Sequence, residues 1–166
     1  MMKLPENFVT YDEARKAGFI KMKELKEQGA RVVGIFCSFV PVEILMAAGA
    51  VSASLCASSE QPITAAETKL PRNLCPLIKA SYGFALTDTC PYFYFADLIV
   101  GETTCDGKTK MFELMNELKE KLRTSLLLIT HDLGVVAQVC DRVAIMYAGE
   151  IVESGTIAEV FDHPHH

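Results

Sequence analysis

The sequence lacks the clustered positive charge with which proteins bind nucleic acid or an anionic membrane surface. Its 166 residues include 16 Lys and Arg against 21 Asp and Glu, which gives a formal net charge of −5. A chain with this mildly acidic balance is not built to coat a polyanion, because such a surface repels net negative charge. We therefore expect no nucleic-acid partner.

The sequence also has no apolar run that is continuous enough to cross a membrane. Its most apolar stretch, residues 34–57, is interrupted by Pro41 and Gly49, whereas a spanning helix needs about 20 apolar residues without a break. The first 29 residues carry acidic side chains and lack the apolar core of a secretory leader. We therefore expect no membrane insertion and a cytoplasmic location.

What is present is an alternation of helical and strand-like segments. Short apolar runs rich in β-branched residues predict strands, and apolar stripes at helical spacing predict helices. The expected strands are residues 31–37, 51–56, 97–101, 125–130 and one or two within 142–152. The expected helices are residues 10–28, 42–48, 73–85, 109–122, 133–140 and 156–161, the first opened by a capping box at Thr10 and Glu13. This alternation predicts an α/β, Rossmann-like fold: a largely parallel sheet with helices on both faces, in a single compact domain.

Residues 101–109 approximate a phosphate-binding loop, because Gly101 and Gly107 precede Lys108. That loop needs four residues between its glycines so that the backbone N–H groups surround the phosphates. Here five residues separate them. We therefore predict a polar loop in which Asp106 caps the following helix, and no nucleotide site.

Six cysteines are present, and none forms a Cys-x-x-Cys pair. In a reducing compartment, cysteines are thiols or metal ligands more often than disulfides. Cys75 precedes Pro76 at an expected helix start, and Cys105 follows an expected strand. The carboxyl ends of strands are where α/β sheets build their sites, and soft thiolates there suit an iron–sulfur cluster.

Three phrases carry a resemblance to a known family: residues 34–43 (GIFCSFVPVE), 70–79 (LPRNLCPLIK) and 103–108 (TTCDGK). They resemble the 2-hydroxyacyl-CoA dehydratase family, which also includes benzoyl-CoA reductase subunits and double-cubane cluster proteins. The resemblance extends from residue 1 to about residue 120 and implies a [4Fe-4S] protein of anaerobes with Cys75 and Cys105 as cluster ligands.

The same resemblance implies a lyase that acts on an acyl-CoA by radical reductive dehydration, driven by a low-potential electron. Its expected partners are a similar dehydratase-type subunit and a separate ATP-hydrolysing activator protein. The family takes a further cluster ligand from a C-terminal half that this sequence does not contain, so we expect a truncated component that is inactive alone. No residue is assigned as the catalytic acid or base.

A second resemblance begins near residue 121. Residues 125–137 (SLLLITHDLGVVA) and 140–155 (CDRVAIMYAGEIVESG) resemble the ATP-binding subunits of oligopeptide and dipeptide ABC importers. The resemblance implies that His131 corresponds to a histidine that touches the γ-phosphate. An ATP-binding subunit of a peptide importer is therefore the alternative function. Hydrolysis needs a phosphate-cradling loop, an acidic metal-binding strand and a water-orienting residue, and none of these is found in the sequence.

We therefore interpret the chain as a chimera, with a dehydratase-like domain at residues 1–120 and an ABC-ATPase-like segment at 121–166 that completes the sheet. A third interpretation is a folded α/β chimera without activity. Among the other cysteines, Cys37 ends a strand and is either close to the cluster or a core thiol. Cys56 and Cys140 are interpreted as small hydrophobes, and Cys90 as a loop residue that could substitute as a ligand.

Overall fold

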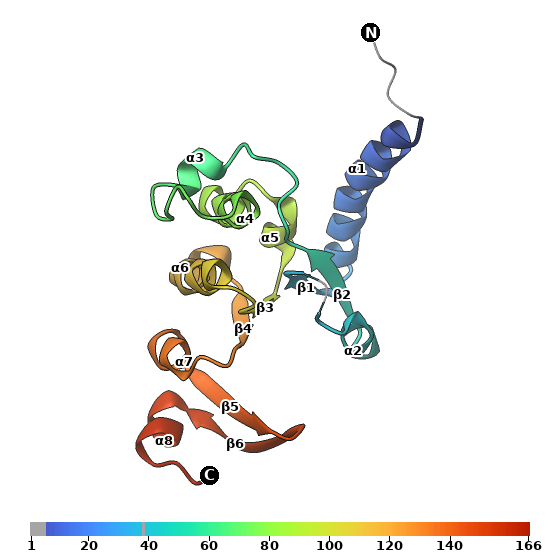
Figure 1. Cartoon of the computed structure of the whole chain (residues 1–166). Coiled ribbons are helices and arrows are strands. Elements are labelled where there is room, and N and C mark those ends of the chain that lie inside the picture. The colour runs from blue at the N-terminus through green and yellow to red at the C-terminus, as the bar shows by residue number, and fades with distance from the viewer. Residues whose placement is uncertain (1–5, 38) are drawn as a thin grey trace.

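The computed structural model describes residues 6–37 and 39–166 (Figure 1). Its centre is a parallel sheet in the order β2-β1-β3-β4. These strands are β1 (Arg31–Ile35), β2 (Ala50–Ser54), β3 (Leu98–Glu102) and β4 (Ser125–Ile129). An antiparallel pair, β5 (Arg142–Tyr147) and β6 (Glu150–Thr156), follows. The helices are α1 (Glu6–Glu27), α2 (Val42–Ala47), α3 (Ile63–Ala66), α4 (Pro76–Thr87), α5 (Pro91–Phe95), α6 (Asp106–Leu122), α7 (Leu133–Val139) and α8 (Ile157–Asp162).

Helices cover the two faces of the parallel sheet unequally. On one face, α4, α5 and α6 bury the largest core cluster, which includes Tyr82, Phe93 and Phe112. Met22 of α1 extends this cover to Val32 of β1. The opposite face is covered by α2, whose side chains pack on the strand residues Val33, Ile35 and Val100. The predicted fold class, a largely parallel α/β sheet with helices on both faces, is confirmed.

The parallel sheet includes the strand that follows the expected join. Strand β4 pairs with β3 in parallel from Leu98↔Ser125 to Glu102↔Ile129. The β5–β6 hairpin lies beyond the β4 edge, together with α8 (Figure 1). Its turn places Ala148 at φ 48° and Gly149 at φ 87°, and positive φ at both central residues is what a two-residue type I′ hairpin turn requires.

Two local expectations are wrong. Helix α1 already includes Glu6, so Thr10 lies inside it and does not open it. Asp106 is the first residue of α6 and Cys105 is its N-cap; an acidic residue in the first turn still stabilises the helix through the dipole. The short helices α3 and α5 were not among the expected elements, because four or five residues are too few to display a helical period.

Within residues 6–37 and 39–166, no helix combines the length and the apolar character needed to span a membrane.

Candidate functional site

The two cysteines predicted as metal ligands occupy equivalent positions on neighbouring helices. Cys75 is the N-cap residue of α4 and Cys105 is the N-cap residue of α6, and both are exposed free thiols. The two helix starts touch, because a Cβ at Gly107 of α6 would lie 2.9 Å from Ile78 Cδ1 and 3.0 Å from Leu74 Cδ1. Both thiols therefore lie where the positive ends of two packed helices favour a negatively charged group.

The cluster implied by the resemblance needs more ligands than these two. A [4Fe-4S] cluster is held by cysteine thiolates, typically four. In the part of the chain that the structure describes, no group of three or more His, Cys, Asp or Glu side chains is placed to hold a metal ion. The described residues therefore supply part of a ligand set and do not fit a complete cluster on their own.

Cys37 lies at the same edge of the sheet but is engaged by another side chain. It follows β1 with φ 61°, and Lys108 Nζ donates a hydrogen bond to its Sγ at 2.8 Å. Lys108 is only 8 % exposed. Lys108 was not predicted as a site residue, since a lysine at the start of a helix gives no sequence sign of burial.

The glycines of the rejected phosphate loop serve packing. A Cβ at Gly101 would overlap the ring of Phe112, and Gly107 is covered by two side chains of the α4 segment. Close packing of β3 on α6 explains Gly101, and close packing of α6 on the α4 segment explains Gly107, without a bound phosphate. One polar atom at this end of β3 is unexplained: Glu102 Oε1 is buried, and among the described residues it has no hydrogen-bond partner.

The remaining cysteines are partly buried. Cys90 is the N-cap of α5, not a loop residue, and it packs with Cys56 against the main core. Burial raises the pKa of the Cys140 thiol, and the Asp141 carboxylate adds to this effect while Lys119 opposes it. A thiol that resists ionisation is a poor metal ligand, as expected for the small hydrophobe predicted at Cys140.

His131 lies in the exposed loop between β4 and α7. Next to it, Asp132 caps α7 by accepting a hydrogen bond from the Val135 N–H at 3.1 Å. Thr130, which precedes His131, connects this loop to the loop that carries Cys105, because its Oγ1 lies 2.7 Å from Thr103 Oγ1. The site segments of both resemblances therefore meet at one edge of the sheet.

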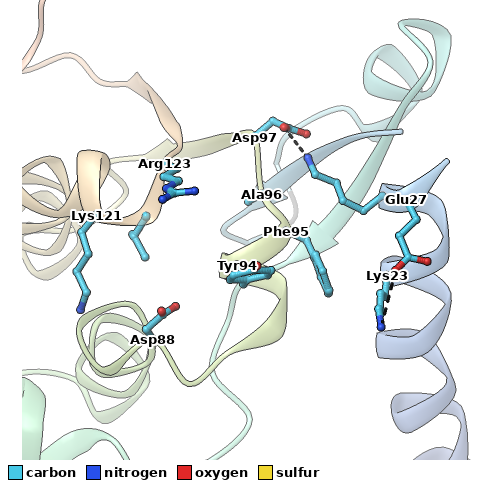
Figure 2. A pocket seen from close by; sticks show the side chains of 11 residues that line it. Lys23, Glu27, Asp88, Tyr94, Phe95, Ala96, Asp97, Lys121 and Arg123 are labelled. Atoms are coloured by element: carbon cyan, nitrogen blue, oxygen red, sulfur yellow. Dashed lines mark hydrogen bonds and ion pairs between the residues drawn. The ribbon is translucent and has the colours of Figure 1, made fainter. Parts of the chain in front are cut away.

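A separate hollow of about 740 Å³ lies at the opposite edge of the sheet, before β3 (Figure 2). Its charged residues are largely paired: Lys26 bonds to Asp97, and Lys23 to Glu27. Burial alone raises the pKa of Asp97, but hydrogen bonds from Lys26 and from the Val32 N–H outweigh it and hold the pKa below its ordinary value. The residues that line this hollow include residues of α1 and residues just before β3. The hollow was not anticipated from the sequence.

Comparison with known proteins finds both resemblances. Residues 37–131 match the family described as 2-hydroxyglutaryl-CoA dehydratase, D-component. The YjiM protein of Escherichia coli (strain K12), whose name is that of a dehydratase subunit, is 61% identical over 116 residues, which are 70% of this chain and 30% of YjiM. The oligopeptide transport ATP-binding protein OppD of Bacillus subtilis (strain 168) is 58% identical over 59 residues, which are 36% of this chain and 16% of OppD.

A third relative, the methionine import ATP-binding protein MetN 1 of Pseudomonas putida (strain KT2440), is 37% identical over 99 residues, 59% of this chain and 30% of MetN 1. The chain therefore spans less than a third of the length of each of these relatives. The predicted combination of a dehydratase-like part with a part similar to peptide-importer ATP-binding subunits is confirmed.

Proposed function

The chain belongs to the 2-hydroxyglutaryl-CoA dehydratase D-component family, and we propose that it is the iron–sulfur component of a dehydratase of this kind. Cys75 and Cys105 would supply two thiolate ligands of a [4Fe-4S] cluster, and the remaining ligands would come from outside the described residues. The observation that carries this proposal is the pair of exposed thiols at the starts of two packed helices. Such a cluster, when bound, supplies a low-potential electron.

The proposed reaction class is the radical reductive dehydration of a 2-hydroxyacyl-CoA. The proposed partners are a similar dehydratase-type subunit and an ATP-hydrolysing activator that delivers the electron, all in the cytoplasm. These partners follow from family membership, which supports a dehydratase subunit. Mixing the reconstituted chain with such an activator and ATP would test the electron transfer, because a reduced cluster has a characteristic electron paramagnetic resonance spectrum.

The ligand proposal is tested by iron and acid-labile sulfide analysis after anaerobic reconstitution. Wild-type protein is expected to retain iron after desalting, and Cys75→Ser and Cys105→Ser are each expected to lose most of it. Cys140→Ser is the matched control, because that thiol is partly buried at the far end of α7, and it should bind iron like the wild type. Folded protein without iron, or iron that both substitutions leave unchanged, would refute the proposal.

A second candidate function is nucleotide binding by residues 121–166, which is favoured by their similarity to OppD. We propose a division at residue 120, inside α6; the OppD match, at 59 residues, also includes residues before 121. The exposed His131 would approach the terminal phosphate of ATP. Equilibrium titration with a fluorescent ATP analogue tests this function: binding that His131→Ala abolishes would support it, and the absence of binding would exclude it.

A further inference from the structure

Cys37 and Lys108 form a hydrogen-bonded pair near the proposed cluster ligands. Their Sγ and Nζ atoms are 2.8 Å apart although the residues are 71 positions apart in the sequence. Lys108 is almost completely buried. Over residues 6–37 and 39–166, the amine has this sulfur as its hydrogen-bond partner and no carboxylate pairs with it. A buried lysine is usually held by a carboxylate, so this pairing calls for an explanation.

The backbone holds the sulfur in place. Cys37 has φ 61°, a left-handed conformation that is unfavourable for a residue with a side chain. Such conformations persist where the surrounding structure imposes them, and they concentrate at functional sites. Here the end of β1 is fixed by a hydrogen bond from the Phe36 N–H to the Val100 carbonyl oxygen of β3, immediately before the strained residue.

A small cavity adjoins the pair. Its volume is about 30 Å³, and both Cys37 and Lys108 line it. The other lining residues are mainly apolar: Phe36, Cys56, Leu77, Ile78, Ser81 and Met111. A space of this size is comparable to the volume of one water molecule, and a bound water would need several polar partners, which a mainly apolar lining offers sparingly. Dioxygen is an apolar molecule of comparable size, so it fits a space that both of these residues line.

We propose that Cys37 and Lys108 are a site of covalent modification, at which dioxygen joins Sγ and Nζ through a single bridging oxygen atom. The S–H bond and one N–H bond of the neutral amine break, and an S–O bond and an O–N bond form. The second oxygen atom leaves as water with the two hydrogens. Sulfur and nitrogen each give up two electrons, and dioxygen accepts all four. The present gap suits one intervening atom, whereas a direct S–N bond would require the side chains to move closer.

The bridge would tie the end of β1 to the first turn of α6, directly beside the start of the helix that Cys105 caps. A covalent link between residues so far apart in sequence restricts the unfolded chain, so the oxidised protein should unfold at a higher denaturant concentration. A dithiol reductant would return the thiol and the amine and release the bridging oxygen as water. This site is independent of the proposed cluster, since neither Cys75 nor Cys105 takes part.

The test uses the full chain, purified without oxygen and divided between anaerobic and air-saturated buffer. After digestion, mass spectrometry of the aerated sample should show a linked pair of peptides containing Cys37 and Lys108, heavier by one oxygen and lighter by two hydrogens than the two peptides together. Dithiothreitol should separate them. Lys108→Arg should remove the link, and Cys56→Ser, which alters the other thiol of the cavity, should retain it.

Absence of the linked peptides from aerated wild-type protein would overturn the proposal without reference to any variant. So would a product that is lighter by two hydrogens, contains no added oxygen, survives Lys108→Arg and disappears in Cys56→Ser. That product would be a disulfide between Cys37 and Cys56. Because the result is a mass rather than an activity, it does not depend on whether the protein binds iron.

Discussion

Strands β3 and β4 are neighbours in one sheet, yet they are buried to very different degrees. The centre of β3 is covered on both faces, with Ile99 only 1 % exposed. In β4, which is equally apolar, alternate residues are open to solvent: Leu127 is 51 % exposed and Ile129 is 54 % exposed. Leu126 and Leu128 of β4 pack against the main core. Strand β4 is therefore part of the same sheet as β3, but only one of its faces is covered.

The same contrast extends to the regions on either side of the proposed division. The largest core cluster lies entirely between Phe36 and Leu122. In residues 123–166, all of which the structure describes, the buried apolar side chains are Val135, Val136 and Val160. Burial of apolar surface is the main stabilising contribution to a fold. The first region therefore holds most of the stability, and the second depends on its attachment through β4.

The largest effect that tests this contrast is expected from Phe112→Ala. The Phe112 ring is fully buried and packs edge-on against Phe36, so its removal should lower the free energy of unfolding by about 3–5 kcal/mol. Ile129→Ala, at the exposed face of β4, should change it by only about 0.5 kcal/mol. Urea denaturation followed by circular dichroism measures both. Equal losses would show that the two regions contribute alike.

Gly101→Ala comes next in size. The added Cβ would overlap the Phe112 ring, and forcing extra volume into a packed core costs about 1–3 kcal/mol. The comparison is Gly134→Ala in α7, where the new Cβ would meet Asp132 Oδ1 at 3.2 Å; that side chain is exposed and can shift, so the loss should be smaller than for Gly101→Ala. Combining Gly101→Ala with Phe112→Leu should recover part of the loss. A well-tolerated Gly101→Ala would refute the packing explanation for this glycine.

The sequence was sufficient to predict the order of the main elements because their apolar periods are clear. β3 and β4 were both expected as strands, and both are. The sequence did not reveal that one face of β4 is exposed to solvent. An apolar run indicates that a strand can be buried, but it does not show whether another element covers each face. The start of α1 was misplaced for a related reason: Thr10 and Glu13 have the form of a capping box, but helical backbone already precedes them.

At the candidate site, the sequence identified Cys75 and Cys105 from their surrounding phrases, and their role as ligands remains a prediction. It could not identify the partner of Cys37. Lys108 reaches that sulfur only because β1 and α6 are brought together by the sheet, and contacts between distant residues leave no mark in local spacing. The hollow at the opposite edge escaped notice for the same reason, since Lys26 and Asp97 meet across 71 positions.

Asp132→Ala should have a smaller effect. Because Asp132 lies in residues 123–166, this substitution tests whether that region opens separately from the rest of the chain. Loss of the N-cap bond to Val135 typically costs about 1 kcal/mol, while Asp132→Asn, which keeps a capping oxygen, should cost little. If the second region is held loosely, the loss should appear as faster amide hydrogen exchange in α7 and the β5–β6 hairpin, with exchange in β1 and β3 unchanged. Uniform acceleration through both regions would mean that they unfold as one unit.

The smallest effects concern pH, because the carboxylates involved are partly exposed to water and screened by it. Hydrogen bonds from Thr156 lower the pKa of Glu159, and the pKa of Asp97 is also lowered despite its burial. A carboxyl whose pKa is lower in the folded state stabilises the fold above its unfolded pKa, about 4, and loses this contribution as the pH falls through the folded pKa.

Asp97→Asn should therefore lower the denaturation midpoint at neutral pH. It should also make the decline of that midpoint between neutral pH and acid shallower. Glu159→Gln should change the pH dependence of the midpoint less, because it affects only α8, in residues 123–166, where few side chains are buried. A larger change from Glu159→Gln than from Asp97→Asn would mean that this region contributes more to stability than residues 6–122.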